Sequence, residues 1–153
     1  MYGFGVDEFL DTLRDHDVRL LLDVRQRRGV RGPEYAWANS KRLQAALKDA
    51  GVEYGHHPEL APTTQLRRLQ YAEDDRQGVG KRSRVELSDA YRRGYLAEIL
   101  DRADLGAVAA ELREYGTGAL FCVERDPEAC HRSLIAERLA TDHSLPVTHL
   151  RPS

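Results

Sequence analysis

The chain has 153 residues, of which 41% are apolar and 31% are charged. This balance is typical of a globular protein and excludes a disordered or fibrous chain, so we expect residues 1–153 to form a single domain. A net charge of −2 argues against a protein that coats nucleic acid over its whole surface. The longest apolar run, at residues 119–123, is far shorter than the roughly 18 residues of a membrane span. We therefore expect no membrane contact and a cytoplasmic location.

The first half of the chain shows strand and helix patterns in alternation. The expected elements are a short strand at residues 2–4, a helix at 6–16, a buried strand at 18–24, a helix at 40–50 and a strand at 52–56. Asn39 or Ser40 can cap the second of these helices, and Gly51 supplies the left-handed residue that ends it.

The second half continues the alternation. We expect helices at residues 64–76, 88–103 and 104–115, a strand at 119–123, a helix at 127–141 and a last strand at 146–150. This order favours an α/β fold with a Rossmann-like, mostly parallel sheet of about five strands and helices on both faces. Ligands of such sheets bind beyond the carboxyl ends of the strands, which selects residues 23–39, 55–64 and 122–133 as candidate site segments.

The strand at 18–24 is followed by the pair Asp23 and Arg25. Two residues apart in an extended chain, both side chains project on the same side. Arg25 can present its guanidinium to a phosphate or carboxylate, with Asp23 as its orienting partner or as a base. An internal ion pair that holds the loop is the equally supported alternative.

The loop after Arg25 mixes cations with aromatic residues, which suits phosphates and stacked bases. Arg28, Arg31 and Tyr35 are the candidate ligand contacts, while Trp37 fits core packing equally well.

The most specific local pattern is CVERDPEACHRS at residues 122–133. It predicts a strand end followed by a helix start, where free backbone N–H groups and the helix dipole attract anions. Cys130, His131, Arg132 and Ser133 are the candidate anion contacts, and Glu124 is a candidate acid or base. Reactive cysteines, a metal held by Cys122, Cys130 and His131, and a purely structural role are the alternatives. Because adjacent cysteine and histidine side chains usually point apart, we expect no metal site.

Three narrower expectations concern single residues. Glu59, after the histidine pair 56–57, is a candidate general base. Both cysteines should be reduced thiols in the cytoplasm, and neither should be an essential nucleophile. Arg132 opposes the positive end of the helix dipole, so a carboxylate such as Glu124 or Asp23, or a bound anion, should compensate it.

Four patterns together resemble a family of bacterial and archaeal proteins known as domain of unknown function 488. They are DVR after a strand, the helix end AGVEY, the PELAPT segment, and FCVERDPEACHRSLIAERL, and they cover essentially the whole chain. The resemblance implies an α/β fold and a shared polar site, without an established activity. This chain departs from the commoner family pattern after Arg25 and at LAPT, which suggests a branch with a different ligand.

The leading hypothesis is an enzyme without cofactor or metal that binds a phosphate-bearing substrate, such as a nucleotide or a nucleic-acid component. Arg25 and Arg132 would bind the anion, and Asp23, Glu59 and Glu124 are the acid/base candidates. The alternative is a non-catalytic module that binds nucleic acid or a protein through the basic loop at residues 25–37.

Overall fold

A parallel three-stranded sheet forms the centre of the protein, which the computed structural model describes over residues 1–153. The strands are β1 (Leu20–Asp23), β2 (Glu53–His56) and β3 (Gly118–Phe121), in the order β2-β1-β3. Leu22 of β1 is in register with Gly55 and Leu120. β1 is buried along its whole length because it has a strand on either side and helices above and below.

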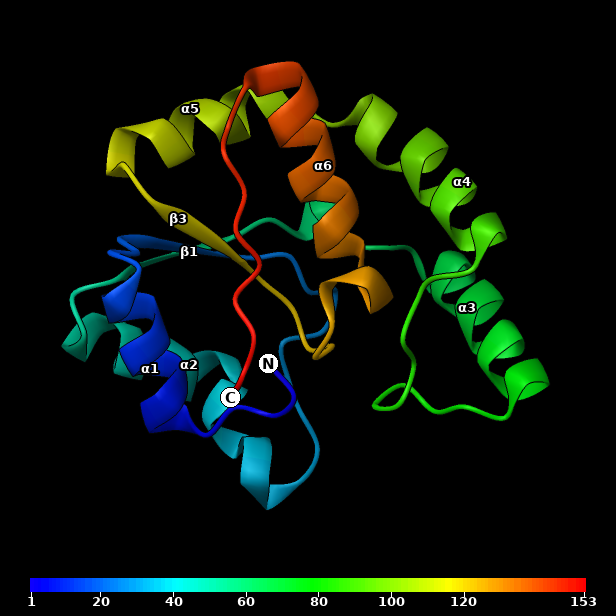
Figure 1. Ribbon diagram of the computed structural model, residues 1–153, viewed down its shortest axis with the longest axis horizontal. Coiled ribbons are helices and arrows are strands. Elements are labelled where there is room, and N and C mark those ends of the chain that lie inside the picture. The colour runs from blue at the N-terminus through cyan, green and yellow to red at the C-terminus, as the bar shows by residue number, and fades with distance from the viewer.

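Four helices cover the two faces of this sheet (Figure 1). α1 (Val6–Asp15) and α2 (Ser40–Asp49) lie on one side of the strands, and α5 (Leu105–Tyr115) and α6 (His131–His143) on the other. Gly118 permits the close approach of α5 to β3, since a Cβ atom there would lie 2.2 Å from Cδ2 of Leu112. The α/β class and the helices on both faces are therefore confirmed.

Two further helices, α3 (Thr64–Gln77) and α4 (Asp89–Glu98), pack on each other beyond the carboxyl ends of the strands (Figure 1). Each begins at a hydroxyl cap: Thr63 accepts from the backbone N–H of Leu66, and Ser88 from that of Tyr91. The chain also forms four short 3₁₀ helices: η1 (Pro33–Ala38), η2 (Pro58–Leu60), η3 (Leu100–Arg102) and η4 (Pro127–Ala129). None of the helices is long and apolar enough to cross a membrane.

The expectation of about five strands is wrong, because residues 2–4 and 146–150 form no strand. The N-terminal segment instead makes two hydrogen bonds to the loop after β3, from the Tyr2 N–H to the Val123 carbonyl (2.9 Å) and from the Met1 amino group to the Glu124 carbonyl (3.4 Å). Ser144 adopts a left-handed conformation (φ 54°) that turns the chain out of α6. The extended segment that follows crosses β3 instead of running beside it, so its partly apolar sequence covers the strand without pairing (Figure 1).

Two helix boundaries also differ from the sequence expectation. The helix expected at residues 127–141 begins only at His131, because Cys130 is extended (φ −138°, ψ 143°) and separates η4 from α6. Cys130 is therefore the N-cap residue of α6 instead of lying in its first turn. The helix expected at 88–103 ends at Glu98 and is followed by η3.

Candidate functional site

The carboxyl ends of β1 and β3 form the point where the strand order reverses. From β1 the chain crosses to β2 on one side, whereas β3 lies on the other side of β1. In open α/β sheets this reversal leaves a crevice in which ligands bind. The residues at the ends of these two strands are Asp23 to Arg25, which begin with the last residue of β1, and Cys122 to Glu124, which follow β3.

Asp23 and Arg25 pair with each other inside the protein, where their side chains are 0% and 2% exposed. Nη2 and Nε of Arg25 donate to the two carboxylate oxygens of Asp23 at 2.7 and 2.8 Å. Nη1 donates to the Ala38 carbonyl at 2.8 Å, and the guanidinium lies over the Phe121 ring. Tyr54 donates its hydroxyl to Asp23 Oδ2 at 2.7 Å. Of the two alternatives that the sequence leaves open, this arrangement is the internal ion pair.

Three donor groups come together beside this pair and form what we call the thiol–imidazole cluster: Cys122, Cys130 and His131. Their Sγ and ring nitrogen atoms all lie within 4.8 Å of one another, and all three side chains are buried. Cys130 Sγ is 3.8 Å from His131 Nδ1. The expectation that adjacent cysteine and histidine side chains point apart is wrong here, because the extended backbone of Cys130 precedes the first helical residue, His131.

The imidazole of His131 is fixed by a hydrogen bond to the end of β1. Its Nε2 lies 2.8 Å from the carbonyl oxygen of Val24. A carbonyl can only accept a hydrogen bond, so Nε2 carries a proton and Nδ1 is the atom that faces Cys130. The Tyr95 ring, whose hydroxyl donates to the Leu60 carbonyl at 2.7 Å, packs against the imidazole and limits its rotation.

Burial and mutual contact shift the pKa values of the cluster. Burial raises the pKa of the Cys130 thiol, but its contacts with Cys122, Arg132 and His131 outweigh this and lower the pKa well below its usual range. The pKa of Cys122 is raised by its hydrogen bond to Cys130 and by burial. Of the two thiols, Cys130 is therefore the one that loses its proton more readily.

Glu124 lies beside Cys122 and is also buried. Its Oε2 is 3.3 Å from Cys122 Sγ. Burial raises the pKa of this carboxyl above its ordinary value, and the proximity of Cys130 adds to the shift. A group of this kind can hold a proton or bind a cation at the carboxyl end of β3.

Arg132 closes the loop between β3 and α6. Nη1 donates to the Glu124 carbonyl at 2.8 Å and Nη2 to the Arg125 carbonyl at 3.0 Å. Backbone carbonyls are thus its hydrogen-bond partners, whereas the sequence led us to expect a carboxylate or an anion. Since a guanidinium carries five N–H groups, these two bonds leave others free to meet a ligand.

A second buried ion pair supports the same loop and was missed by the sequence analysis. Arg84 Nη2 lies 2.7 Å from Asp74 Oδ2, and Arg84 Nη1 lies 3.3 Å from the Ala129 carbonyl and 3.8 Å from Glu124 Oε1. The signal for Asp74 was its spacing: Leu66, Gln70 and Asp74 recur every four residues on one buried stripe of α3.

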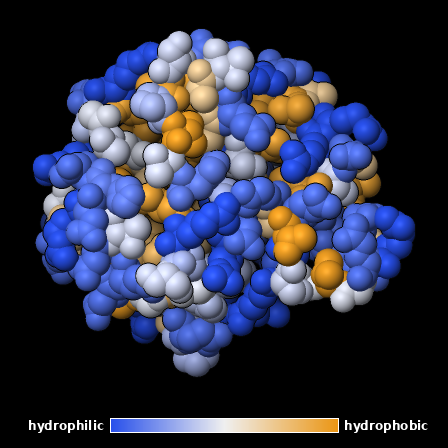
Figure 2. Space-filling model, viewed as in Figure 1, coloured by the Kyte–Doolittle hydropathy of each residue, from blue (hydrophilic) through white to orange (hydrophobic).

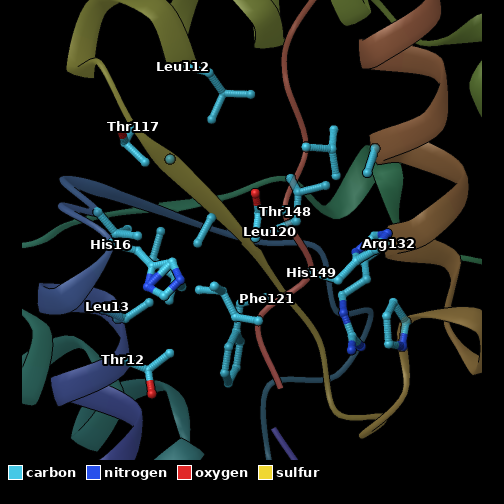
Figure 3. A pocket seen from close by; sticks show the side chains of 18 of the residues that line it. Thr12, Leu13, His16, Leu112, Thr117, Leu120, Phe121, Arg132, Thr148 and His149 are labelled. Carbon is cyan, nitrogen blue, oxygen red and sulfur yellow. The ribbon is translucent and has the colours of Figure 1, made fainter. Parts of the chain in front are cut away.

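A cavity of about 410 Å³ runs along β3, beneath the C-terminal segment 145–150. Its walls are mainly apolar and come from α1, β3, α5, α6 and that segment. Figure 3 shows Arg132 and His149 at one end, and Thr12, Leu13 and His16 at the other. Cys122 also lines the cavity, so the cavity reaches the thiol–imidazole cluster.

Figure 2 shows that hydrophobic residues reach the surface in this view only in separate areas on a mostly hydrophilic face.

The remaining predicted site residues have partners elsewhere. Glu59 binds His57, which also contacts Glu111 of α5. Arg28 donates to the Tyr54 hydroxyl at 3.4 Å, next to the Asp23 pair. The other residues lie as follows: Ser133 donates to the Cys130 carbonyl, the Tyr35 hydroxyl accepts from Gly3, and Arg31 is exposed. The structure therefore brings together Glu124, Cys130, His131 and Arg132, but places Glu59, Arg31 and Tyr35 outside this group.

Comparison with known proteins gives one match. The family model described as "Domain of unknown function DUF488" matches residues 5–139. No curated protein and no solved structure matches the chain. The matched residues include β1 to β3, the Asp23–Arg25 pair and the thiol–imidazole cluster. By this match over most of its length, the chain belongs to the DUF488 family.

Proposed function

We propose that the protein is an enzyme whose substrate has an elongated apolar body and an anionic group, a phosphate or a carboxylate. The cavity along β3 would hold the apolar body, with the anion at the end formed by Arg132 and His149. The observation that carries this proposal is that one cavity of about 410 Å³ has both apolar walls and an arginine at its end. Small-molecule sites commonly combine a cavity of this size with a few placed polar groups.

The choice of Arg132 as the anion contact rests on the hydrogen bonds of the two candidate arginines. Arg25 is 2% exposed and has both its carboxylate partner and a carbonyl partner inside the protein. Arg132 lines the cavity, and its bonds to the Glu124 and Arg125 carbonyls use two of its five N–H groups, so others remain for a ligand.

The Cys122 side chain lines the same cavity. Glu124, Cys130 and His131 stand directly behind it. A binding module would not need four groups capable of proton or electron-pair chemistry beside its ligand, which favours an enzyme. Thiols that stay reduced are typical of the cytoplasm, and a cytoplasmic location is part of this proposal.

The test is a thermal-shift measurement with three matched compounds: octyl phosphate, octanoate and octanol. We expect both anions to raise the melting temperature, and octanol to raise it clearly less. Equal shifts with all three would refute the anion site, and no shift with any would refute the cavity as a binding site. The compound that binds best is then incubated with the protein and its products are sought by mass spectrometry.

Two variants locate the anion. Arg132→Lys keeps the charge but cannot form a two-pronged contact, so the advantage of the anions over octanol should shrink. Arg113→Lys is the matched control, because Arg113 also lines the cavity but bonds the His143 carbonyl instead of the loop that follows β3. In this variant, the anions should exceed octanol in raising the melting temperature by as much as they do in the wild type.

One observation favours a second candidate, a nucleic-acid-binding module. Arg82 contacts both Glu34 and the Arg31 carbonyl, so the two basic loops at residues 25–42 and 79–87 meet on the surface. Binding of short oligonucleotides that weakens steeply with salt, without any effect of the octyl compounds, would support this candidate over the enzyme.

A further inference from the structure

The thiol–imidazole cluster has a composition and geometry that a bound anion does not explain. Two sulfur atoms and one ring nitrogen, from the end of β3 and the start of α6, all lie within 4.8 Å of one another. All three residues are buried, and the chain has no other cysteine. Sulfur and imidazole nitrogen are the donors that bind zinc in proteins.

The hydrogen bonding of His131 prepares its ring as a ligand. Because Nε2 donates to the Val24 carbonyl, the neutral imidazole has its lone pair on Nδ1, the nitrogen that faces Cys130. Metal-binding histidines almost always donate their other ring nitrogen to a carbonyl or carboxylate in this way.

The distances fit a tetrahedral ion. With Zn–S bonds of about 2.3 Å and Zn–N bonds of about 2.0–2.1 Å, a tetrahedron separates sulfur and nitrogen ligands by about 3.5 Å. The observed separation of Cys130 Sγ and His131 Nδ1 is 3.8 Å. A carboxylate oxygen and a sulfur ligand would be about 3.6 Å apart on the same argument. Glu124 Oε2 lies 3.3 Å from Cys122 Sγ but outside the group of atoms within 4.8 Å of one another, so its side chain must turn toward the cluster to become a ligand.

We propose that the protein binds one zinc ion through Sγ of Cys122, Sγ of Cys130 and Nδ1 of His131, with the Glu124 carboxylate as the fourth ligand. Two thiolates and a carboxylate carry three negative charges, so the site with Zn²⁺ has a net charge of −1. Arg84, with Nη1 3.8 Å from Glu124 Oε1, supplies a neighbouring positive charge. The inference does not depend on the cavity ligand, although Cys122 belongs to both sites.

The first experiment measures metal content. The full chain, without a histidine tag, is produced in zinc-supplemented medium and purified with a thiol reductant but no chelator. We expect an equimolar amount of zinc by plasma mass spectrometry. Replacement by Co²⁺ should give the visible absorption of tetrahedral cobalt together with a sulfur-to-cobalt charge-transfer band. Folded, reduced protein that contains only traces of zinc and gives no such cobalt spectrum would overturn the proposal.

Variants identify the ligands. Removing the hydrogen-bond partner of a metal ligand typically weakens metal binding by about 10–100-fold. Cys130→Ser and His131→Gln remove a ligand itself, so each should weaken zinc binding by more than about 100-fold. His57→Gln is the matched control, since His57 is held by Glu59 and Glu111 away from the cluster. Circular dichroism checks that each variant is folded. If a variant is unfolded, the cobalt spectrum of the wild type decides, because sulfur coordination is visible there without any mutation.

The two proposals fail in different ways. If the protein contains zinc but its melting temperature does not respond to the octyl compounds, the metal site is supported and the proposed cavity function is refuted. If the anions raise the melting temperature but the protein binds neither zinc nor cobalt, the cavity function is supported and the metal site is refuted.

Discussion

The carboxyl edge of the sheet contains two buried polar groups that differ in how completely their bonds are made. In the Asp23–Arg25 pair, both carboxylate oxygens and three guanidinium nitrogens have partners within the protein. In the thiol–imidazole cluster, Nδ1 of His131 has only a weak contact with a sulfur atom 3.8 Å away. A buried group that is fully satisfied serves the fold, whereas one with unused lone pairs has capacity for a ligand.

The largest expected effect comes from breaking the complete group. Arg25→Leu leaves the carboxylate of Asp23 buried without its cation, which should lower the free energy of unfolding by about 3–5 kcal/mol. Urea unfolding followed by circular dichroism measures this loss. The exposed neighbour Arg27 provides the control, and Arg27→Leu should change stability by less than about 0.5 kcal/mol. If Arg25→Leu lowers the free energy of unfolding by as little as Arg27→Leu does, the Asp23–Arg25 pair does not stabilise the fold.

Removing the metal should have the next largest effect, and it concerns the incomplete group. At free zinc 100-fold above the dissociation constant, binding adds about 2.7 kcal/mol to the stability of the wild type. A chelator should therefore lower the melting temperature of the wild type and leave that of Cys130→Ser unchanged. Equal responses of the two proteins would contradict zinc binding at Cys130.

Removing a single partner from the complete group should cost less than breaking the ion pair. Tyr54→Phe deletes the hydroxyl that donates to Asp23 Oδ2 at 2.7 Å. We expect a loss of about 1.5 kcal/mol, at the low end for a hydrogen bond to a charged group, because Arg25 still pairs with the carboxylate. Tyr71→Phe is the control, since the Tyr71 hydroxyl meets only Arg67. A loss no greater than that of the control would show that the Tyr54 hydrogen bond is dispensable.

The smallest effect should come from a polar group near the surface. Burial lowers the pKa of His57, but Glu59 and Glu111 outweigh burial and raise the pKa above its ordinary value of 6.5. Protonated His57 thus stabilises the fold fully below about pH 6.5, and the contribution disappears as the pH rises through the raised pKa. We expect a difference of under about 1 kcal/mol between wild type and His57→Gln at pH 6 that vanishes at high pH. Unfolding at a series of pH values checks this, and a difference that does not vary with pH would contradict it.

Local patterns in the sequence were enough to predict much of the fold. The pattern at residues 18–24 predicted a buried strand, which the structure has at Leu20–Asp23, and the helices expected at 88 and 104 follow directly after Ser88 and Asp104 as their N-cap residues. Gly51 adopts a positive φ of 74° just after α2. These features depend on residues close in sequence, so periodicity and capping preferences can show them.

Features that depend on distant residues were not predictable in this way. Residues 146–150 have the apolar character of a strand, but burial alone does not determine whether a segment pairs with a sheet or crosses it. The approach of Cys130 to His131 requires an extended residue between two helical segments, which the spacing of the residues does not show. The contact of Arg84 with Asp74 and Ala129 likewise joins three separate parts of the chain.

The crossing of β3 by the C-terminal segment has a consequence for self-association. β3 is an edge strand, with β1 as its sole neighbour in the sheet. An uncovered edge offers a row of free N–H and C=O groups to which a second chain can add a strand. The segment at residues 145–150 shields this edge and also roofs the cavity, so a displacement of the segment would expose the edge and the cavity together. Occupancy of the cavity by a compound of the proposed class would then hold the segment in place and keep the edge covered.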